Sequence, residues 1–158
     1  MYGSYIHRTN TKIKVDFQPS RIQEKEIEVR YAETDQMGIV YHANYLIWLE
    51  IGRAHFIQQL GFQYADMEKR GIVSPVIDLQ ISYKKPLRYG EIATIKTWVE
   101  SYDGIRVVYG YEVLTPTNEI AATATSKHVC VTKETFQPVL IRKYFPDWHE
   151  AYERAKKR

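Results

Sequence analysis

The sequence predicts an α+β fold in which an antiparallel β-sheet wraps around one long helix. Residues 44–60 are densely apolar with helical spacing, whereas residues 76–132 contain four strand-like segments in succession, joined by short turns. Helical and strand-like segments are therefore segregated along the chain, which is typical of α+β folds with antiparallel sheets. Because the helix is apolar on most of its sides, we expect the sheet to cover it.

Length and composition indicate one compact domain. The chain has 158 residues, of which 44% are hydrophobic and 26% are charged. A domain of this size buries roughly 70% of the surface of its unfolded chain, so it needs neither a metal nor a disulfide for stability. Cys130 is the only cysteine, which excludes an intrachain disulfide and a cysteine-based zinc site and favours a reducing compartment. We therefore expect a cytoplasmic protein without a structural metal.

Charge and hydropathy argue against two further classes of protein. No uncharged apolar run approaches the roughly 20 residues of a membrane-spanning helix, and residues 1–20 lack the apolar block of a secretion signal. The net charge of +3, from 22 basic and 19 acidic residues, is too small to indicate a nucleic-acid binder, and the basic residues at 154–158 are typical of a helix end. The 13 tyrosines and 3 tryptophans, in contrast, favour an oligomer, since both residue types are preferred at interfaces.

The chain begins with a segment of no clear period and continues into a strand. We interpret residues 1–21 as a flexible leader or an added strand through Ile13 and Val15. From Glu26 onward, apolar and charged residues alternate with the period of a half-buried strand; the apolar positions are Ile27, Val29 and Tyr31.

The long helix is predicted over residues 44–60, with Gly61 as the left-handed residue that ends it. Apolar residues recur at spacings of three and four, and further ones lie outside this stripe, namely Leu46, Ile47, Trp48 and Ile51. We therefore expect the first half of the helix to be buried nearly all round. Gly52 lowers helix stability by about 1 kcal/mol relative to alanine, so we expect a close approach to another backbone there.

Strands dominate the rest of the chain. A short helix at 64–70 is followed by strands at 76–83, 91–102, 105–114 and 120–132, which are separated by turn residues. Asp103-Gly104 predicts a tight two-residue hairpin turn. Pro146 can open a last helix. The domain organisation is thus a leader at 1–21, a main domain at 22–142 and a C-terminal helix at 143–158.

The segment from Val29 to Arg53 carries the candidate chemistry. A strand ends, a loop presents Asp35, and a helix begins near His42 to Asn44. Unpaired N–H groups at a helix start can stabilise an oxygen that gains negative charge, and a nearby carboxylate can act as nucleophile or base. Acyl transfer needs both groups. An aspartate before a helix is also a common cap or turn former, and the residues alone leave that alternative open.

The order and spacing of residues in this segment resemble a known active-site motif. The matching positions are Asp35, Gly38, Val40-Tyr41, His42, Asn44-Tyr45, Glu50 and Arg53. They are similar to those of the hotdog-fold acyl-CoA thioesterases of the 4-hydroxybenzoyl-CoA thioesterase-like family, especially its Tol-Pal-associated branch. The similarity extends through residues 70–73 to about Pro138. It implies a hotdog domain at 22–142 and subunits paired edge to edge as a homodimer, often further assembled into a homotetramer, with the active site at the interface.

The resemblance also implies the catalytic roles. Asp35 corresponds to the family's catalytic aspartate, and the helix start at His42 corresponds to the group that polarises the thioester carbonyl. Tyr41 belongs to the same turn. Asp35 would attack the thioester to form an anhydride or would activate a water molecule, and the sequence does not distinguish these routes. The His42 side chain would either donate a hydrogen bond in the site or merely cap and pack.

Further positions are expected to bind the substrate. Lysines and arginines can bind the phosphates of coenzyme A, although each is also a typical surface residue; the candidates are Lys84, Lys85, Arg88, Arg106 and Lys127. Some relatives carry consecutive arginines where this chain has Ser-Tyr-Asp-Gly at 101–104. The remaining candidates line the loop, the acyl pocket or the pantetheine channel; they are Gly38, Tyr45, Glu50, Val73 and Ser74. Glu50 could instead pair with Arg53, and Ser74-Pro75 could be a plain turn before a strand.

The sequence therefore predicts an acyl-CoA thioesterase, a hydrolase that releases a free acid and CoA. We expect neither a metal nor a redox cofactor, and CoA itself counts as part of the substrate. The alternative is a non-catalytic acyl-thioester-binding or assembly protein of the same fold. A hotdog dehydratase is not favoured because no His-Phe-Pro-Gly-like run is present. The acyl group, the choice between CoA and acyl carrier protein, and the choice between dimer and tetramer stay open.

Overall fold

The computed structural model describes residues 19–158. The leader predicted at 1–21, including Ile13 and Val15, thus lies almost wholly outside the described residues. The elements follow in the order β1 (Gln23–Glu28), the 3-10 turn η1 (Tyr31–Glu33), α1 (Asn44–Gln59), α2 (Tyr64–Lys69), β2 (Ile72–Val73), β3 (Val76–Tyr83), β4 (Ile92–Tyr102), β5 (Arg106–Leu114), β6 (Ile120–Val129), β7 (Val131–Thr132), α3 (Ile141–Tyr144) and α4 (Pro146–Ala155).

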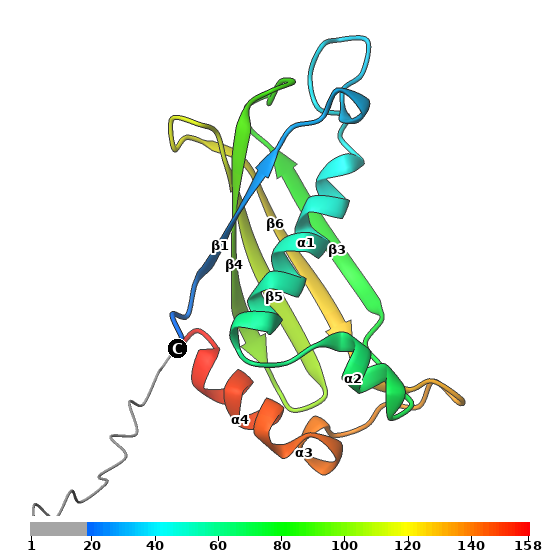
Figure 1. Cartoon of the computed structure of the whole chain (residues 1–158). Helices are drawn as coiled ribbons and strands as arrows, with labels where there is room; N and C mark the ends of the chain where they lie inside the picture. Colours follow the sequence, from blue (N-terminus) through cyan, green and yellow to red (C-terminus); the bar gives the residue numbers. More distant parts are fainter. Residues whose placement is uncertain (1–18) are drawn as a thin grey trace, which may run out of the picture.

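The main sheet has the strand order β1-β4-β5-β6-β3, and every neighbouring pair is antiparallel. The strand β3 is therefore an edge strand although it lies in the middle of the chain. In Figure 1, α1 crosses one face of this sheet between β1 and β3, while α2, α3 and α4 gather at one end. This arrangement confirms the predicted sheet around a long helix.

The core lies between α1 and the sheet, where side chains of alternate strand residues meet the helix. Trp48, Leu49 and Phe56 of α1 are fully buried there. Gly52 is the point of closest approach, because a Cβ atom at this position would lie 2.8 Å from both Ile95 Cγ2 and Thr97 Oγ1. The expected close contact is thus real, but it is made with two side chains of β4 and not with a backbone.

Part of α1 is exposed, contrary to the prediction that its first half is buried nearly all round. Leu46, Ile47 and Ile51 keep 41%, 50% and 38% of their surface exposed. The reason is geometric: one sheet can cover only one side of a helix, so the opposite side of α1 faces outward in a single chain. An apolar stripe of this kind is characteristic of an interaction surface.

Several element boundaries differ from the prediction. The first strand begins earlier and ends at Glu28, because the chain then bends into η1 and leaves Tyr31 exposed. The strand predicted at 120–132 is interrupted at Cys130, whose N–H donates to Ile105 O. Three residues, 103–105, separate β4 from β5; Asp103 N–H donates to Arg106 O, and the Asp103 carboxylate accepts the N–H groups of Ile105 and Arg106, so the turn centres on Gly104 and Ile105, one residue later than predicted.

The C-terminal helix begins at Pro146 as predicted, and the short helix α3 before it was not predicted. Trp148 stacks on Phe62 with ring centroids 4.9 Å apart, which seals the end of the core below α1. None of the helices between residues 19 and 158 combines the length and the apolar character needed to cross a bilayer. The cytoplasmic location stays a prediction.

Candidate active site

The Asp35 loop is a tight turn that its own backbone holds in place. Asp35 N–H donates to Ile39 O at 2.9 Å, and Gly38 N–H donates to Asp35 O at 3.0 Å. Gly38 has a φ of +76°, a conformation that favours glycine, which explains why glycine suits this position. Gly38 thus shapes the loop and does not line the hollow described below. The Asp35 carboxylate accepts Met37 N–H through Oδ1 at 2.8 Å, and within residues 19–158 no hydrogen bond or ion pair reaches Oδ2.

The start of α1 offers unpaired donors beside this loop. Tyr41 N–H is already bonded to Glu33 O at 2.9 Å, and Asn44 N–H is bonded to Tyr41 O. Among the described residues, the N–H groups of His42 and Ala43 donate to no backbone or side-chain acceptor. Unpaired N–H groups at a helix start carry partial positive charge and can bind an anionic oxygen. Tyr41 therefore supplies no backbone donor, whereas His42 does.

A surface hollow of about 330 Å³ brings these groups together. Its wall is mainly apolar and aromatic and includes two lysines; it is lined by Asp35, Met37, Ile39, Val40, His42, Tyr45, Tyr83, Lys84, Lys85 and Pro86. Tyr83 Oη donates to His42 O at 2.7 Å and so ties the helix start to the end of β3. Burial raises the pKa of Tyr45 to about 12, with smaller contributions from Tyr83 and Glu91, so its hydroxyl stays neutral.

Glu33 is a buried carboxylate at this end of the molecule that sequence reasoning missed. It is 4% exposed, and Trp48 Nε1–H donates to its Oε2 at 2.7 Å. Burial by itself raises the pKa of Glu33, but hydrogen bonds from Arg30 and Trp48 outweigh it and hold the pKa below its usual value. The signal in the sequence was the pair of Glu33 and Asp35, two acidic residues at the end of one strand.

Most of the other predicted substrate-binding residues lie away from the hollow. Val73 and Ser74 precede β3, whereas Tyr83 ends it, so they lie at opposite ends of a strand of eight residues, roughly 26 Å long. Arg106 begins β5 beside the end of β4, far from the Asp35 loop, and pairs with Asp103 at 3.6 Å. Arg88 is exposed and does not line the hollow. Lys84 and Lys85 do line it, and Lys85 also pairs with Glu119 at 2.6 Å.

The predicted pair of Glu50 and Arg53 is absent from the ion pairs of residues 19–158. Glu50 is exposed and lies outside the hollow, while Arg53 turns inward and donates to Tyr111 Oη at 3.2 Å. Tyr111 Oη is hydrogen-bonded to Ser126 Oγ at 2.7 Å, and Ser126 Oγ is hydrogen-bonded to His128 Nε2 at 2.8 Å. Burial, reinforced by the charge of Arg53, lowers the pKa of His128 to about 4. We call Arg53, Tyr111, Ser126 and His128 the buried network.

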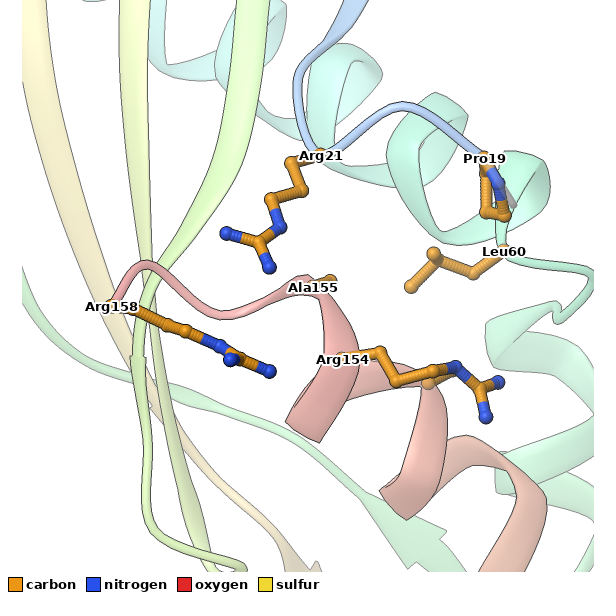
Figure 2. Close-up of a pocket in the computed structure, with 7 residues that line it drawn as sticks. Pro19, Arg21, Leu60, Arg154, Ala155 and Arg158 are labelled. Carbon is orange, nitrogen blue, oxygen red and sulfur yellow. The ribbon is translucent and has the colours of Figure 1, made fainter.

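A second hollow, of about 480 Å³, lies at the other end of the molecule beside the end of α4. Figure 2 shows Arg21, Arg154 and Arg158 among the side chains around it. Its lining by described residues contains neither a carboxylate nor a hydroxyl side chain, so these residues offer no nucleophile for acyl transfer. Across the described part of the chain, no group of three or more His, Cys, Asp or Glu side chains is placed to hold a metal.

Comparisons with known proteins agree with the geometry. Residues 29–149 match the family model of the thioesterase-like superfamily. The Bacillus subtilis protein YneP, provisionally named an acyl-CoA thioesterase, is 62% identical over 136 residues, which cover 86% of this chain and 99% of YneP. The solved structure of a DHNA-CoA thioesterase from Staphylococcus aureus is 50% identical with a TM-score of 0.82, covering 84% of this chain and 89% of that one. The acyl-CoA thioester hydrolase YbgC of Escherichia coli is 25% identical over 117 residues, 74% of this chain and 87% of YbgC.

Proposed function

The chain belongs to the thioesterase-like superfamily, and from this premise we propose that it hydrolyses acyl-CoA thioesters to the free acid and CoA. One observation carries the proposal: Asp35 and His42 line the same hollow, and the backbone N–H of His42, just before α1, has no partner among the described residues. A thioester carbonyl between them would have its oxygen on the His42 N–H and its carbon open to the Asp35 side. Losing a donor of this kind typically costs roughly 10² to 10³ in rate.

Asp35 can act by two routes in this arrangement. In the first, Oδ2 attacks the carbonyl carbon, the C–S bond breaks, CoA leaves as thiolate and takes up a proton, and water hydrolyses the mixed anhydride. In the second, Asp35 takes a proton from a water molecule whose oxygen attacks the carbon directly; the C–S bond then breaks, and the leaving thiolate of CoA takes up that proton from Asp35. Both routes place negative charge on the carbonyl oxygen and use no cofactor. We propose Asp35 as nucleophile or general base and the His42 N–H as the polarising donor.

The residues that line the hollow indicate which of them contact the acyl group and which contact CoA. Tyr45, Tyr83 and Met37 present aromatic and apolar surface, which suits an acyl group, including an aromatic one. Lys84 and Lys85 are exposed and line the same hollow, so they can pair with the phosphates of CoA. The S. aureus neighbour is named for an aromatic acyl-CoA, which supports testing aromatic substrates first.

We further propose that a second copy of the chain completes the site. Within residues 19–158, the outer side of the edge strand β3 has no neighbouring strand, and Val76 and Ile77 of this strand are about half exposed. Two copies that pair β3 with β3 in antiparallel fashion would bring the beginning of one strand to the end of the other. Val73 and Ser74 of one copy would then approach Tyr83 and Asp35 of its partner. The exposed stripe of Leu46, Ile47 and Ile51 is a surface that a dimer or tetramer would cover.

A thiol-release assay over acyl-CoAs of increasing chain length and aromatic acyl-CoAs tests the activity. We expect the wild type to release CoA from some of them, and Asp35→Asn to lower kcat by about 10³-fold or more with an unchanged Tm. Asn keeps the size of the side chain and the Oδ1 acceptor for Met37, so the loop should stay intact.

Two results would contradict the proposal. Turnover by Asp35→Asn at the wild-type rate would remove Asp35 from the mechanism. Binding of acyl-CoA by the wild type without turnover on any ester, acyl-carrier-protein esters included, would favour the non-catalytic alternative.

A further inference from the structure

Glu33 joins the loop of Asp35 to the start of α1 through its backbone. Its carbonyl oxygen accepts two hydrogen bonds, from Tyr41 N–H at 2.9 Å and from Asn44 Nδ2 at 2.8 Å. Both donors lie at the point where α1 begins. Because Tyr41 N–H is used in this way, His42 becomes the first residue of the helix start with an unpaired N–H group among the described residues. The carbonyl of Glu33 therefore helps to decide which N–H is available to a substrate.

The side chain of Glu33 adds a third attachment to the same helix. Trp48 Nε1–H donates to Oε2 at 2.7 Å, while Arg30 N–H donates to Oε1 at 2.9 Å. Arg30 Nε–H also approaches Oε1, at 3.3 Å. Asn44 and Trp48 are four residues apart in α1, so they lie on one side of its first turns, and Tyr41 lies three residues before the helix begins. The carboxylate thus bridges the end of the first strand and the first turns of α1.

These contacts fix the distance between the two halves of the candidate site. Only Thr34 separates Glu33 from Asp35, and Thr34 is itself bridged to Val40. The Asp35 loop is therefore held relative to the His42 N–H by the hydrogen bonds of Glu33 and by the bridge between Thr34 and Val40. Reacting groups in acyl transfer must be aligned closely, and a displacement of about 1 Å can cost roughly 10²-fold in rate.

We propose that Glu33 is a positioning residue for thioester hydrolysis, which holds Asp35 and the N–H groups of α1 in register without touching the substrate. The inference rests on the proposed function and names a residue of the same site. Glu33 faces Trp48 and Arg30 and not the hollow, which is lined by other residues. Its effect should therefore fall on kcat and leave substrate affinity nearly unchanged.

The test compares Glu33→Gln, Glu33→Ala and the wild type by steady-state thiol release. Gln keeps one of the two oxygens, so it can still accept either from Trp48 or from Arg30, whereas Ala keeps no acceptor. We expect kcat to fall about 10-fold in Glu33→Gln and about 100-fold in Glu33→Ala, with KM within about twofold of the wild type. Amide hydrogen exchange should become faster in the segment 35–46 in both variants, while the strands β5 and β6 keep their protection.

The matched control is Ser126→Ala, which removes hydrogen bonds to two partners in the buried network, away from Asp35. Ser126→Ala should lower Tm while leaving kcat within about twofold of the wild type. It therefore separates a general loss of stability from a displacement of Asp35 relative to the start of α1. Should Glu33→Gln fold and keep the wild-type kcat, the positioning role would be overturned while the proposed function stood. A wild type without thioesterase activity would overturn the proposed function and the inference together.

Discussion

The helix α1 spans two polar regions that differ in how completely their groups are paired. Near its start, Asp35 and His42 line an open hollow, and neither Asp35 Oδ2 nor the His42 N–H has a partner among the described residues. Along its middle, Tyr111, Ser126 and His128 are linked by hydrogen bonds and almost fully buried; the only buried side-chain atom of this buried network without a partner among the described residues is Arg53 Nε. Polar groups without a partner at the surface can form hydrogen bonds to a substrate, whereas buried groups that are already hydrogen-bonded to one another stabilise the fold. The start of α1 should therefore govern activity, and its middle should govern stability.

The largest stability effect expected in the middle region is a dependence on pH. The pKa of His128 is about 4 in the folded protein, because the side chain is buried near Arg53, against about 6.5 when unfolded. The unfolded chain therefore takes up a proton first as the pH falls, and the free energy of unfolding should drop by about 3 kcal/mol between pH 6.5 and pH 4.

Urea unfolding of the wild type and of His128→Gln at several pH values separates the contribution of His128 from that of the carboxylates. The difference between the two free energies should depend on pH only within that window. An equal pH dependence in both proteins would show that His128 does not cause it.

Next in size is the contact at Gly52. A methyl group there would lie 2.8 Å from Ile95 Cγ2 and Thr97 Oγ1, so Gly52→Ala should lower the free energy of unfolding by about 1 to 3 kcal/mol despite alanine's better helix propensity. Thr97 Oγ1 is buried without a hydrogen-bond partner in the described part of the chain. Adding Thr97→Ala to the Gly52→Ala variant removes this oxygen, so it should restore part of the lost free energy of unfolding. Thermal unfolding measures both variants. A Gly52→Ala protein as stable as the wild type would contradict the close packing of α1 on β4.

A smaller effect on activity is expected from Tyr83→Phe. The variant loses the hydrogen bond to His42 O, which is worth about 1 kcal/mol, so kcat should fall several-fold. Tyr89→Phe is the matched control, since Tyr89 is 65% exposed and outside the hollow. If both variants behaved alike in thiol release, the anchoring of the helix start by Tyr83 would be wrong.

The smallest effect should come from His42→Ala. The exposed ring makes no side-chain hydrogen bond among the described residues, and the substitution keeps the backbone N–H. We expect kcat to stay within about threefold of the wild type when thiol release is measured. A loss of 10²-fold would assign a chemical role to the imidazole and move the polarising group from the backbone to the side chain.

The fold was predictable because its signals are local. Helical spacing at 44–60 and alternation in the later strands identified α1 and the sheet, and the resemblance to the hotdog thioesterases is confirmed by the family match and by the S. aureus structure. The exposed side of α1 was mispredicted because periodicity shows that a residue is apolar but not what covers it. The interruption at Cys130 depends on a hydrogen bond to Ile105, which is distant in sequence, so no local pattern reveals it.

The candidate site was predictable only in part. The loop of Asp35 and the helix start at His42 were found together because they are close in sequence. Val73, Ser74 and Arg106 were grouped with them through the family resemblance, and the single chain places these three at the other end of the strands. Glu33 was missed because its role arises from contacts with Trp48 and Asn44 that only the folded chain brings together.

The most direct test of the central claim is a crystal structure of the Asp35→Asn variant with an unhydrolysed acyl-CoA. The account predicts that the thioester oxygen accepts a hydrogen bond from the N–H of His42 or Ala43, at about 2.7–3.1 Å, with the substituted side chain at position 35 on the opposite side of the carbonyl carbon. A thioester bound with its carbonyl turned away from the start of α1, or seated in the arginine-lined hollow beside α4, would contradict it.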